Sequence, residues 1–291
     1  MEKKKNRKRS KVKENTRLEA IRNVFYRNKK SKKLFAIFLI LRVLVIYSAI
    51  REIAMGNYTN TFFCLVALVL FTMPAIIEDT LKIEFPTVME VLIYLFIYAA
   101  WILGELNNFY EIFPYWDTML HTINGFLCAG LGFSFIDILN KKSNKFNLSP
   151  LYLAIASLCF SVTIGVMWEF FEFSMDRVFL SDMQKDEIVE TVSTVTLDET
   201  KSNNPVRIRD IDKTIIITKD GKQTEINGYL DIGLYDTTED LFVNFVGAFI
   251  FSVLGFLYVY NRDEKAFIKH FIPKKIRIRK RRKKKEIIES I

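Results

Sequence analysis

The sequence predicts an all-α integral membrane protein, a six-helix transmembrane bundle with a small β-hairpin inserted in its last extracytoplasmic loop. Half of the 291 residues are hydrophobic, yet 26% are charged, which is unusual for a soluble domain. Apolar and charged residues are also segregated, and six apolar runs approach the roughly 17–25 residues that a membrane-spanning helix needs. These runs cover residues 34–50, 60–77, 87–104, 118–138, 150–173 and 241–260.

Both ends of the chain are strongly basic. Residues 1–33 contain fifteen Lys or Arg, and residues 262–291 contain thirteen. Basic segments that flank membrane spans remain in the cytoplasm and attract anionic lipid head groups. We therefore expect a basic cytoplasmic segment at 1–33 and a basic cytoplasmic tail at 261–291. We expect no nucleic-acid partner, because no aromatic or motif context accompanies these charges.

Six spans with both termini inside define a topology for a multi-pass protein of the cell membrane. Spans one to five then lie within 34–177, and span six covers 241–260. The loop at 139–149 contains three lysines and is expected in the cytoplasm. The acidic loop at 178–240 is expected outside, where it meets a substrate or an extracytoplasmic partner of unknown identity.

This outer loop contains a hairpin pattern. Runs rich in β-branched residues lie on either side of Asp220-Gly221, a dipeptide that favours a type I′ turn. Residues 214–218 and 223–227 are therefore expected to pair as antiparallel strands. Because a lone hairpin is marginally stable, it is expected to pack on the membrane domain or on a partner.

Nearly all ionisable groups within the spans lie near the outer ends that this topology predicts. The stretch "GVMWEFFEF" at 165–173 places two glutamates at the end of span five. Chance would distribute such groups over both faces of the membrane, and intramembrane ionisable residues usually face the bundle interior. The polar residues at this depth are Glu105, Asp117, His121, Glu169, Glu172, Asp236, Asp240 and Asn244.

Helical spacing places these groups on shared faces. Residues three or four apart lie side by side on a helix, and three successive spans each carry such a pair. Gly125 and Gly247 continue two of the stripes and would allow the helices to approach closely. The pairs are Asp117 with His121, Glu169 with Glu172, and Asp240 with Asn244.

A cluster of this composition is suited to a divalent metal ion such as zinc, manganese or magnesium. The expected ligands are Asp117, His121, Glu169 and Asp236. The ion would activate water or polarise a phosphoryl group on a lipid-linked or envelope substrate. Glu172 or Asp240 would then serve as the general base.

Two other functions are compatible with the same residues. Carboxylates with a histidine can carry protons or bind a cation in a transporter, and they can also hold helices together in a structural scaffold without catalysis. We favour the enzyme, because the groups open on one face whereas transporters usually bind at the midplane. The chain has no H-E-x-x-H, G-x-S-x-G, C-x-x-C or Walker-type motif, which excludes the corresponding soluble enzyme classes.

The order of motifs over about residues 86–260 resembles the YjdF-like family of bacterial inner-membrane proteins, and more distantly VanZ-like proteins. The resemblance implies a small multi-span fold in the inner membrane and says little about activity. The acidic loop before Asp236 is an insertion relative to the shorter connection of that family. The matching residues are Asp117, His121, Gly125, Trp168, Glu169, Glu172, Asp236, Asp240, Asn244 and Gly247.

Overall fold

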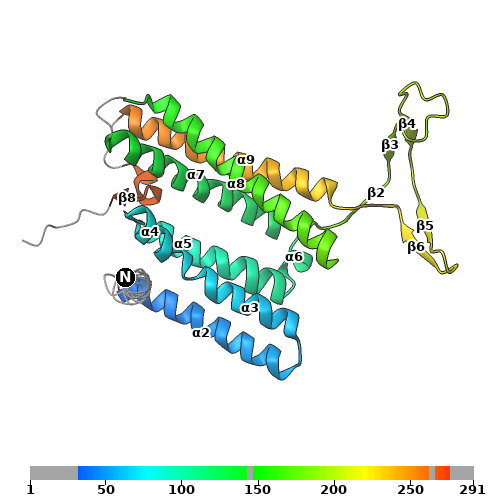
Figure 1. Cartoon of the computed structure of the whole chain (residues 1–291), viewed down its shortest axis with the longest axis horizontal. Helices are drawn as coiled ribbons and strands as arrows, with labels where there is room; N and C mark the ends of the chain where they lie inside the picture. Colours follow the sequence, from blue (N-terminus) through cyan, green and yellow to red (C-terminus); the bar gives the residue numbers. More distant parts are fainter. Residues whose placement is uncertain (1–31, 143–146, 262–265, 276–291) are drawn as a thin grey trace, which may run out of the picture. The chain divides into compact units, whose positions relative to one another are not determined.

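The computed structural model describes residues 32–142, 147–261 and 266–275. Among these residues, six helical segments are long and apolar enough to cross a membrane (Figure 1). Each contains one of the six apolar runs, so the expected all-α membrane architecture is confirmed. Most of both basic terminal segments lies outside the described residues. The six segments are Leu34–Ala54, Tyr58–Leu81, Thr87–Leu106, Trp116–Asn140, Pro150–Phe179 and Leu234–Asn261.

The chain divides into two compact units, and three long helices contribute to both. The first unit comprises the described parts of 1–116, 129–157 and 251–291, and the second comprises 117–128 and 158–250. The shared helices are α7 (Trp116–Lys142), α8 (Pro150–Phe179) and α9 (Leu234–Asn261).

The first unit has an apolar core. Helix α2 packs against α3 and α5, and α3 packs against η2. Val45, Cys64 and Tyr94 are almost completely buried between them, whereas Ile40 and Tyr47 on α2 are 58% and 66% exposed. Large exposed apolar faces of this kind require lipid. The elements are α2 (Lys32–Ala54), α3 (Tyr58–Leu70), α4 (Met73–Leu81), α5 (Thr87–Tyr98), η2 (Ala99–Leu106) and α6 (Phe109–Ile112).

A short strand pair joins two distant loops of the first unit. Strand β1 (Ile83–Glu84) pairs antiparallel with β8 (Lys274–Lys275), which follows the single-turn helix η3 (Phe267–Phe271). The loop between spans two and three therefore meets the segment after span six. A six-span topology requires these two segments to lie on the same side of the membrane.

The second unit carries the β insertion between α8 and α9 (Figure 1). Its strands form three antiparallel pairs, β2 with β7, β3 with β4 and β5 with β6. The expected hairpin is confirmed, with β5 and β6 in register from Lys213↔Asn227 to Ile217↔Gln223. The other two pairs were not predicted. The strands are β2 (Glu187–Val189), β3 (Val192–Thr194), β4 (Val206–Ile208), β5 (Lys213–Ile217), β6 (Gln223–Asn227) and β7 (Tyr229–Asp231).

The turn of this hairpin differs from the expected type I′. The Gly221 amide donates to the Thr218 carbonyl, and the Thr218 amide donates to the Lys222 carbonyl. Within the turn only Gly221 has a positive φ, 85°. The connection is therefore a three-residue loop with a left-handed glycine. Type I′ requires positive φ at both central residues, and Asp220 does not adopt it.

Helix α9 begins at Leu234, about two turns before the apolar run at 241–260. The Asp231 carboxylate accepts hydrogen bonds from the amides of Leu234 and Tyr235 and so satisfies two of the free donors at the helix start. The polar residues at 234–240 therefore belong to helix α9 and not to the loop. Hydropathy alone did not predict that the helix begins before residue 241.

Candidate functional site

Three helices of the second unit supply the clustered side chains. Helix α7 carries Asp117 and His121, and α8 carries Glu169 and Glu172. Helix α9 carries a triplet spaced by four residues, so its members share one face. This triplet is Asp236, Asp240 and Asn244.

Small residues allow these helices to approach closely in the second unit. A Cβ atom at Gly125 would lie 2.0 Å from the Asn244 carbonyl oxygen, and one at Gly247 would lie 2.0 Å from the Thr122 carbonyl oxygen. The Ser161 hydroxyl donates to the Gly125 carbonyl at 2.7 Å. Helix backbones this close together leave no room for a side chain. This explains why the sequence has glycine at positions 125 and 247.

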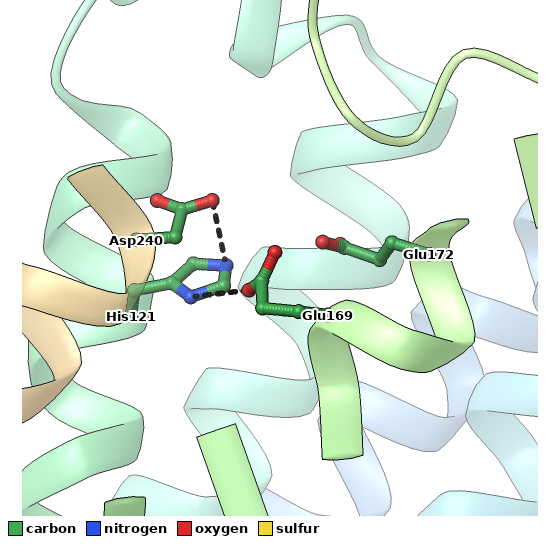
Figure 2. A group of neighbouring side chains, drawn as sticks. All are labelled: His121, Glu169, Glu172 and Asp240. Carbon is green, nitrogen blue, oxygen red and sulfur yellow. Dashed lines mark ion pairs between the residues drawn. The ribbon is translucent and has the colours of Figure 1, made fainter. Parts of the chain in front are cut away.

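Four buried side chains converge on one point, and we call them the buried group: His121, Glu169, Glu172 and Asp240. One donor atom from each lies within 4.8 Å of the donor atoms of the others. Figure 2 shows the imidazole between two carboxylates. His121 Nδ1 lies 3.8 Å from Glu169 Oε1, and Nε2 lies 3.5 Å from Asp240 Oδ2.

A second set, which we call the rim group, comprises Asp117, Asp236 and Asp240. Its donor atoms also lie within 4.8 Å of one another, and two of its members are partly exposed. Asp117 Oδ1 lies 3.4 Å from His121 Nε2. Asp240 belongs to both groups and therefore links them.

The carboxylates of the buried group have few partners within the described residues. No donor in the described parts of the chain meets either oxygen of Glu169 at hydrogen-bonding distance and angle, although the Thr237 hydroxyl is its polar neighbour on α9. Glu172 Oε2 and Asp240 Oδ2 also have no hydrogen-bond partner among these residues. In the described chain, His121 is the basic side chain that forms ion pairs with these carboxylates. Buried charge without compensation is costly, so the arrangement requires protons or a cation.

Several neighbouring groups that were not predicted as site residues orient the cluster. The Trp168 indole N–H donates to Glu172 Oε1 at 2.9 Å. The Lys185 amide donates to Asp236 Oδ2 at 2.9 Å. The Asn124 side-chain amide donates to Asn244 Oδ1 at 3.2 Å. A signal existed for two of them. Asn124 is three residues after His121 and Trp168 is four residues before Glu172, so each shares a helix face with a predicted site residue, and Trp168 also belongs to the motifs that carry the family resemblance.

The structure brings together six of the eight polar residues that the sequence singled out. Asn244 is buried next to them, although it belongs to neither group. Glu105 lies on η2 in the first unit and belongs to neither group. The sequence suggested four ligands, Asp117, His121, Glu169 and Asp236. The buried group retains His121 and Glu169 and combines them with the two suggested bases, Glu172 and Asp240.

One imidazole and several carboxylates form a donor set for a hard or borderline divalent ion. Ligands on opposite sides of one ion, at bond lengths of about 2.0–2.4 Å, lie roughly 4–5 Å apart. The 4.8 Å spread of the buried group is therefore compatible with a single ion. Such an ion would also neutralise the unpartnered oxygens.

Comparison with known proteins supports the membrane architecture. Residues 33–261 match the model of a family described as "Predicted membrane protein (DUF2238)". A protein of Thermotoga maritima named "Uncharacterized protein" is 30% identical over 105 residues, which are 36% of this chain and 53% of that protein. The chain thus matches about half the length of this curated relative. No solved structure matches.

Proposed function

Because this chain belongs to the DUF2238 family of predicted membrane proteins, we propose a function for it at the bilayer: a metal-dependent enzyme whose buried group binds a divalent ion. The observation that carries this proposal is the set of unpartnered oxygens on Glu169, Glu172 and Asp240. They converge with His121 within 4.8 Å. Three ionised carboxylates beside one imidazole leave an excess of negative charge, which a divalent cation offsets.

The donor set limits the identity of the ion. One nitrogen and three carboxylates favour zinc or manganese, whereas magnesium prefers oxygen ligands and retains several waters. The described cysteines belong to neither group, so a thiolate-rich zinc site is not the type proposed. The Trp168 indole, which donates to Glu172, would orient a ligand as outer-shell partners do.

The reaction that this site suits is hydrolysis of a phosphoryl group on a lipid-linked or envelope substrate. The ion would supply a bound water of lowered pKa and would polarise the phosphoryl oxygen. The water oxygen bonds to phosphorus as the bond to the leaving oxygen breaks. Glu172 would accept the proton of the water through an oxygen that does not bind the ion and would return it to the leaving oxygen, while Asp240 would remain a ligand.

The proposed orientation places both termini in the cytoplasm and the site towards the extracytoplasmic side of the cell's inner membrane. An even number of spans puts the two ends on one side, and basic flanks favour the cytoplasm. The basic termini would bind anionic lipids there. The sequence resemblance to YjdF-like proteins is compatible with this location, and the β insertion at 187–231 would then meet an extracytoplasmic partner or substrate.

One observation favours a second candidate, proton-coupled transport. Each nitrogen of His121 faces a carboxylate, Glu169 at 3.8 Å and Asp240 at 3.5 Å. Such a row of acid, imidazole and acid can pass a proton. Proton uptake into proteoliposomes that hold metal-free protein, abolished by His121→Ala, would support transport over catalysis.

The first test is the metal content of the purified protein in detergent, measured by mass spectrometry without chelators. We expect a stoichiometric ion in the wild type and its loss in His121→Ala and Glu169→Gln. Glu105→Gln is the matched control, because Glu105 lies outside both groups, and it should retain the ion. A well-folded wild type that takes up no zinc or manganese would refute the metal-dependent enzyme.

A further inference from the structure

We propose that the rim group binds a second divalent cation and that Asp240 bridges the two ions, so that the site is binuclear. This inference rests on the proposed function of the buried group and extends it. Asp240 is the residue shared by the two groups. A carboxylate can offer one oxygen to each of two ions.

The first support is the position of Asp240 itself. The residue is only 3% exposed, and its Oδ2 has no hydrogen-bond partner within the described residues. That oxygen lies 3.5 Å from His121 Nε2, and Asp117 Oδ1 lies 3.4 Å from the same nitrogen. The unpartnered oxygen of Asp240 is thus directed towards the region where the rim group meets the buried group.

The second support is the division of the cluster by the imidazole ring. Glu169 lies against Nδ1, whereas Asp117 and Asp240 lie against Nε2. Asp117 of the rim group therefore lies on the opposite side of the ring from Glu169, and the carboxylates of the two groups together do not all surround one centre. The donor atoms of the buried group lie within 4.8 Å of one another, and so do those of the rim group. The two groups share the Asp240 carboxylate, as expected for two neighbouring ions.

The third support is the fixed orientation of Asp236. Its Oδ2 accepts the Lys185 amide at 2.9 Å. The segment before Lys185 is held in turn, because the amides of Met183 and Gln184 donate to the Asp176 carboxylate at 2.7 and 2.8 Å. Metal ligands are typically oriented by such outer contacts.

The fourth support is the summed negative charge of the carboxylates in the two groups, which two divalent ions offset better than one. When ionised, the five carboxylates of the two groups carry a summed charge of −5. One divalent ion reduces this sum to −3, and a second reduces it to −1. Two ions about 3.5–4 Å apart stabilise both the entering and the leaving oxygen of an in-line displacement, which narrows the proposed chemistry to phosphoryl transfer to water.

Manganese provides the test, because two neighbouring Mn²⁺ ions give a spin-coupled electron paramagnetic resonance spectrum and a single ion does not. We expect about two Mn²⁺ per wild-type chain with a coupled spectrum. Asp236→Asn should reduce this to about one uncoupled ion held by the buried group. Asp240→Asn should reduce the content further, because it removes the bridging ligand. Glu239→Gln, an exposed neighbour on α9, is the matched control and should keep both ions.

The outcomes separate the two proposals. One Mn²⁺ per wild-type chain, unchanged by Asp236→Asn, would overturn the second ion and leave the proposed function intact. Two uncoupled ions would also overturn the bridging role of Asp240. A folded wild type without manganese or zinc would overturn both proposals. Each variant is compared at equal monodispersity in size-exclusion chromatography, so that loss of fold is not read as loss of an ion.

Discussion

Two buried glutamates of the first unit, Glu52 and Glu90, have surroundings that differ from those of the buried carboxylates in the second unit. In the first unit, Glu52 is 4% exposed and pairs with the Arg51 guanidinium at 2.7 Å, and its second oxygen accepts from the Asn60 amide at 3.1 Å. Glu90, also buried, accepts from the Tyr94 hydroxyl at 3.1 Å. These acids are compensated by groups that the chain itself supplies.

In the second unit three similarly buried carboxylates lie around one imidazole, which pairs with two of them, Glu169 and Asp240. Four oxygens of these carboxylates have no hydrogen-bond partner within the described residues. The difference shows that burial alone does not identify a functional acid. An acid compensated by neighbouring groups contributes to structure, whereas convergent uncompensated acids require something from outside the chain.

The largest effect is expected where the backbones of the second unit touch. Gly247→Ala places a Cβ atom 2.0 Å from the Thr122 carbonyl oxygen, so the helices must separate. We expect a loss of at least about 1–3 kcal/mol of stability, measured by thermal unfolding in detergent, together with loss of bound metal. Gly255→Ala is the control in the first unit, because its new Cβ meets side-chain rings and no backbone, Phe133 at 3.0 Å and Phe251 at 3.6 Å. Equal unfolding temperatures for the two variants would contradict the close packing.

The next prediction compares one glutamate from each unit in the presence of a chelator. Glu52→Gln removes the charge that pairs with Arg51 and should lower the unfolding temperature. Glu169→Gln removes one of several crowded negative charges and should leave the temperature unchanged or raise it.

When metal is added in place of the chelator, Glu169 should contribute to the stability of the protein. A ligand at 100 times its Kd stabilises a protein by about 2.7 kcal/mol, so zinc or manganese should raise the unfolding temperature of the wild type and of Glu52→Gln. Glu169→Gln should not respond. A drop for Glu169→Gln in chelator as large as that for Glu52→Gln would mean that both acids are structural.

The sequence predicted what depends on local pattern. Six apolar runs predicted six spans, and the spacing of Asp117 with His121 and of Glu169 with Glu172 placed each pair on one helix face. The hairpin was also local, because its strands are separated by only five residues.

Pairings between distant segments were not predictable in this way. Strand β2 pairs with β7 about forty residues later, and β1 pairs with β8 across most of the chain; neither has a local signal. The grouping of the carboxylates depends on how three helices pack, which depth in the membrane does not specify. Depth alone placed Glu105 with residues of the second unit, whereas Glu105 belongs to neither the buried group nor the rim group. The four-residue spacing along the helix correctly placed Asp117 beside His121. Helical spacing was therefore a more reliable guide to the cluster than depth in the membrane.

A smaller effect is expected from the indole that orients Glu172. Trp168→Phe keeps the ring but removes the N–H that donates to Glu172 Oε1. Loss of an outer contact typically weakens metal affinity by about 10–100-fold, and titration with manganese would measure it. The matched control is Trp101→Phe in the first unit, where the indole packs on Phe63; it should keep wild-type affinity. Unchanged affinity in Trp168→Phe would show that Glu172 is not a ligand.

The smallest effect concerns the β insertion, where the acids are exposed and compensated locally. Asp198 accepts hydrogen bonds from the amides of Thr200, Ser202 and Asn204. These bonds and that of the Thr200 hydroxyl hold the pKa of Asp198 below its ordinary value, with the hydroxyl as the largest cause.

A carboxyl group whose pKa is lower in the folded state stabilises the fold above its unfolded pKa, about 3.9, and this contribution is lost as the pH falls through the lower folded value. Hydrogen exchange of the Ser202 and Asn204 amides should therefore accelerate, relative to that of the β5–β6 amides, as the pH falls below about 4. Asp198→Asn should abolish this pH dependence while leaving the metal content unchanged. If protection of the two amides were the same on both sides of this pH range, the Asp198 carboxylate would not organise the loop, and local compensation would be limited to the buried acids of the first unit.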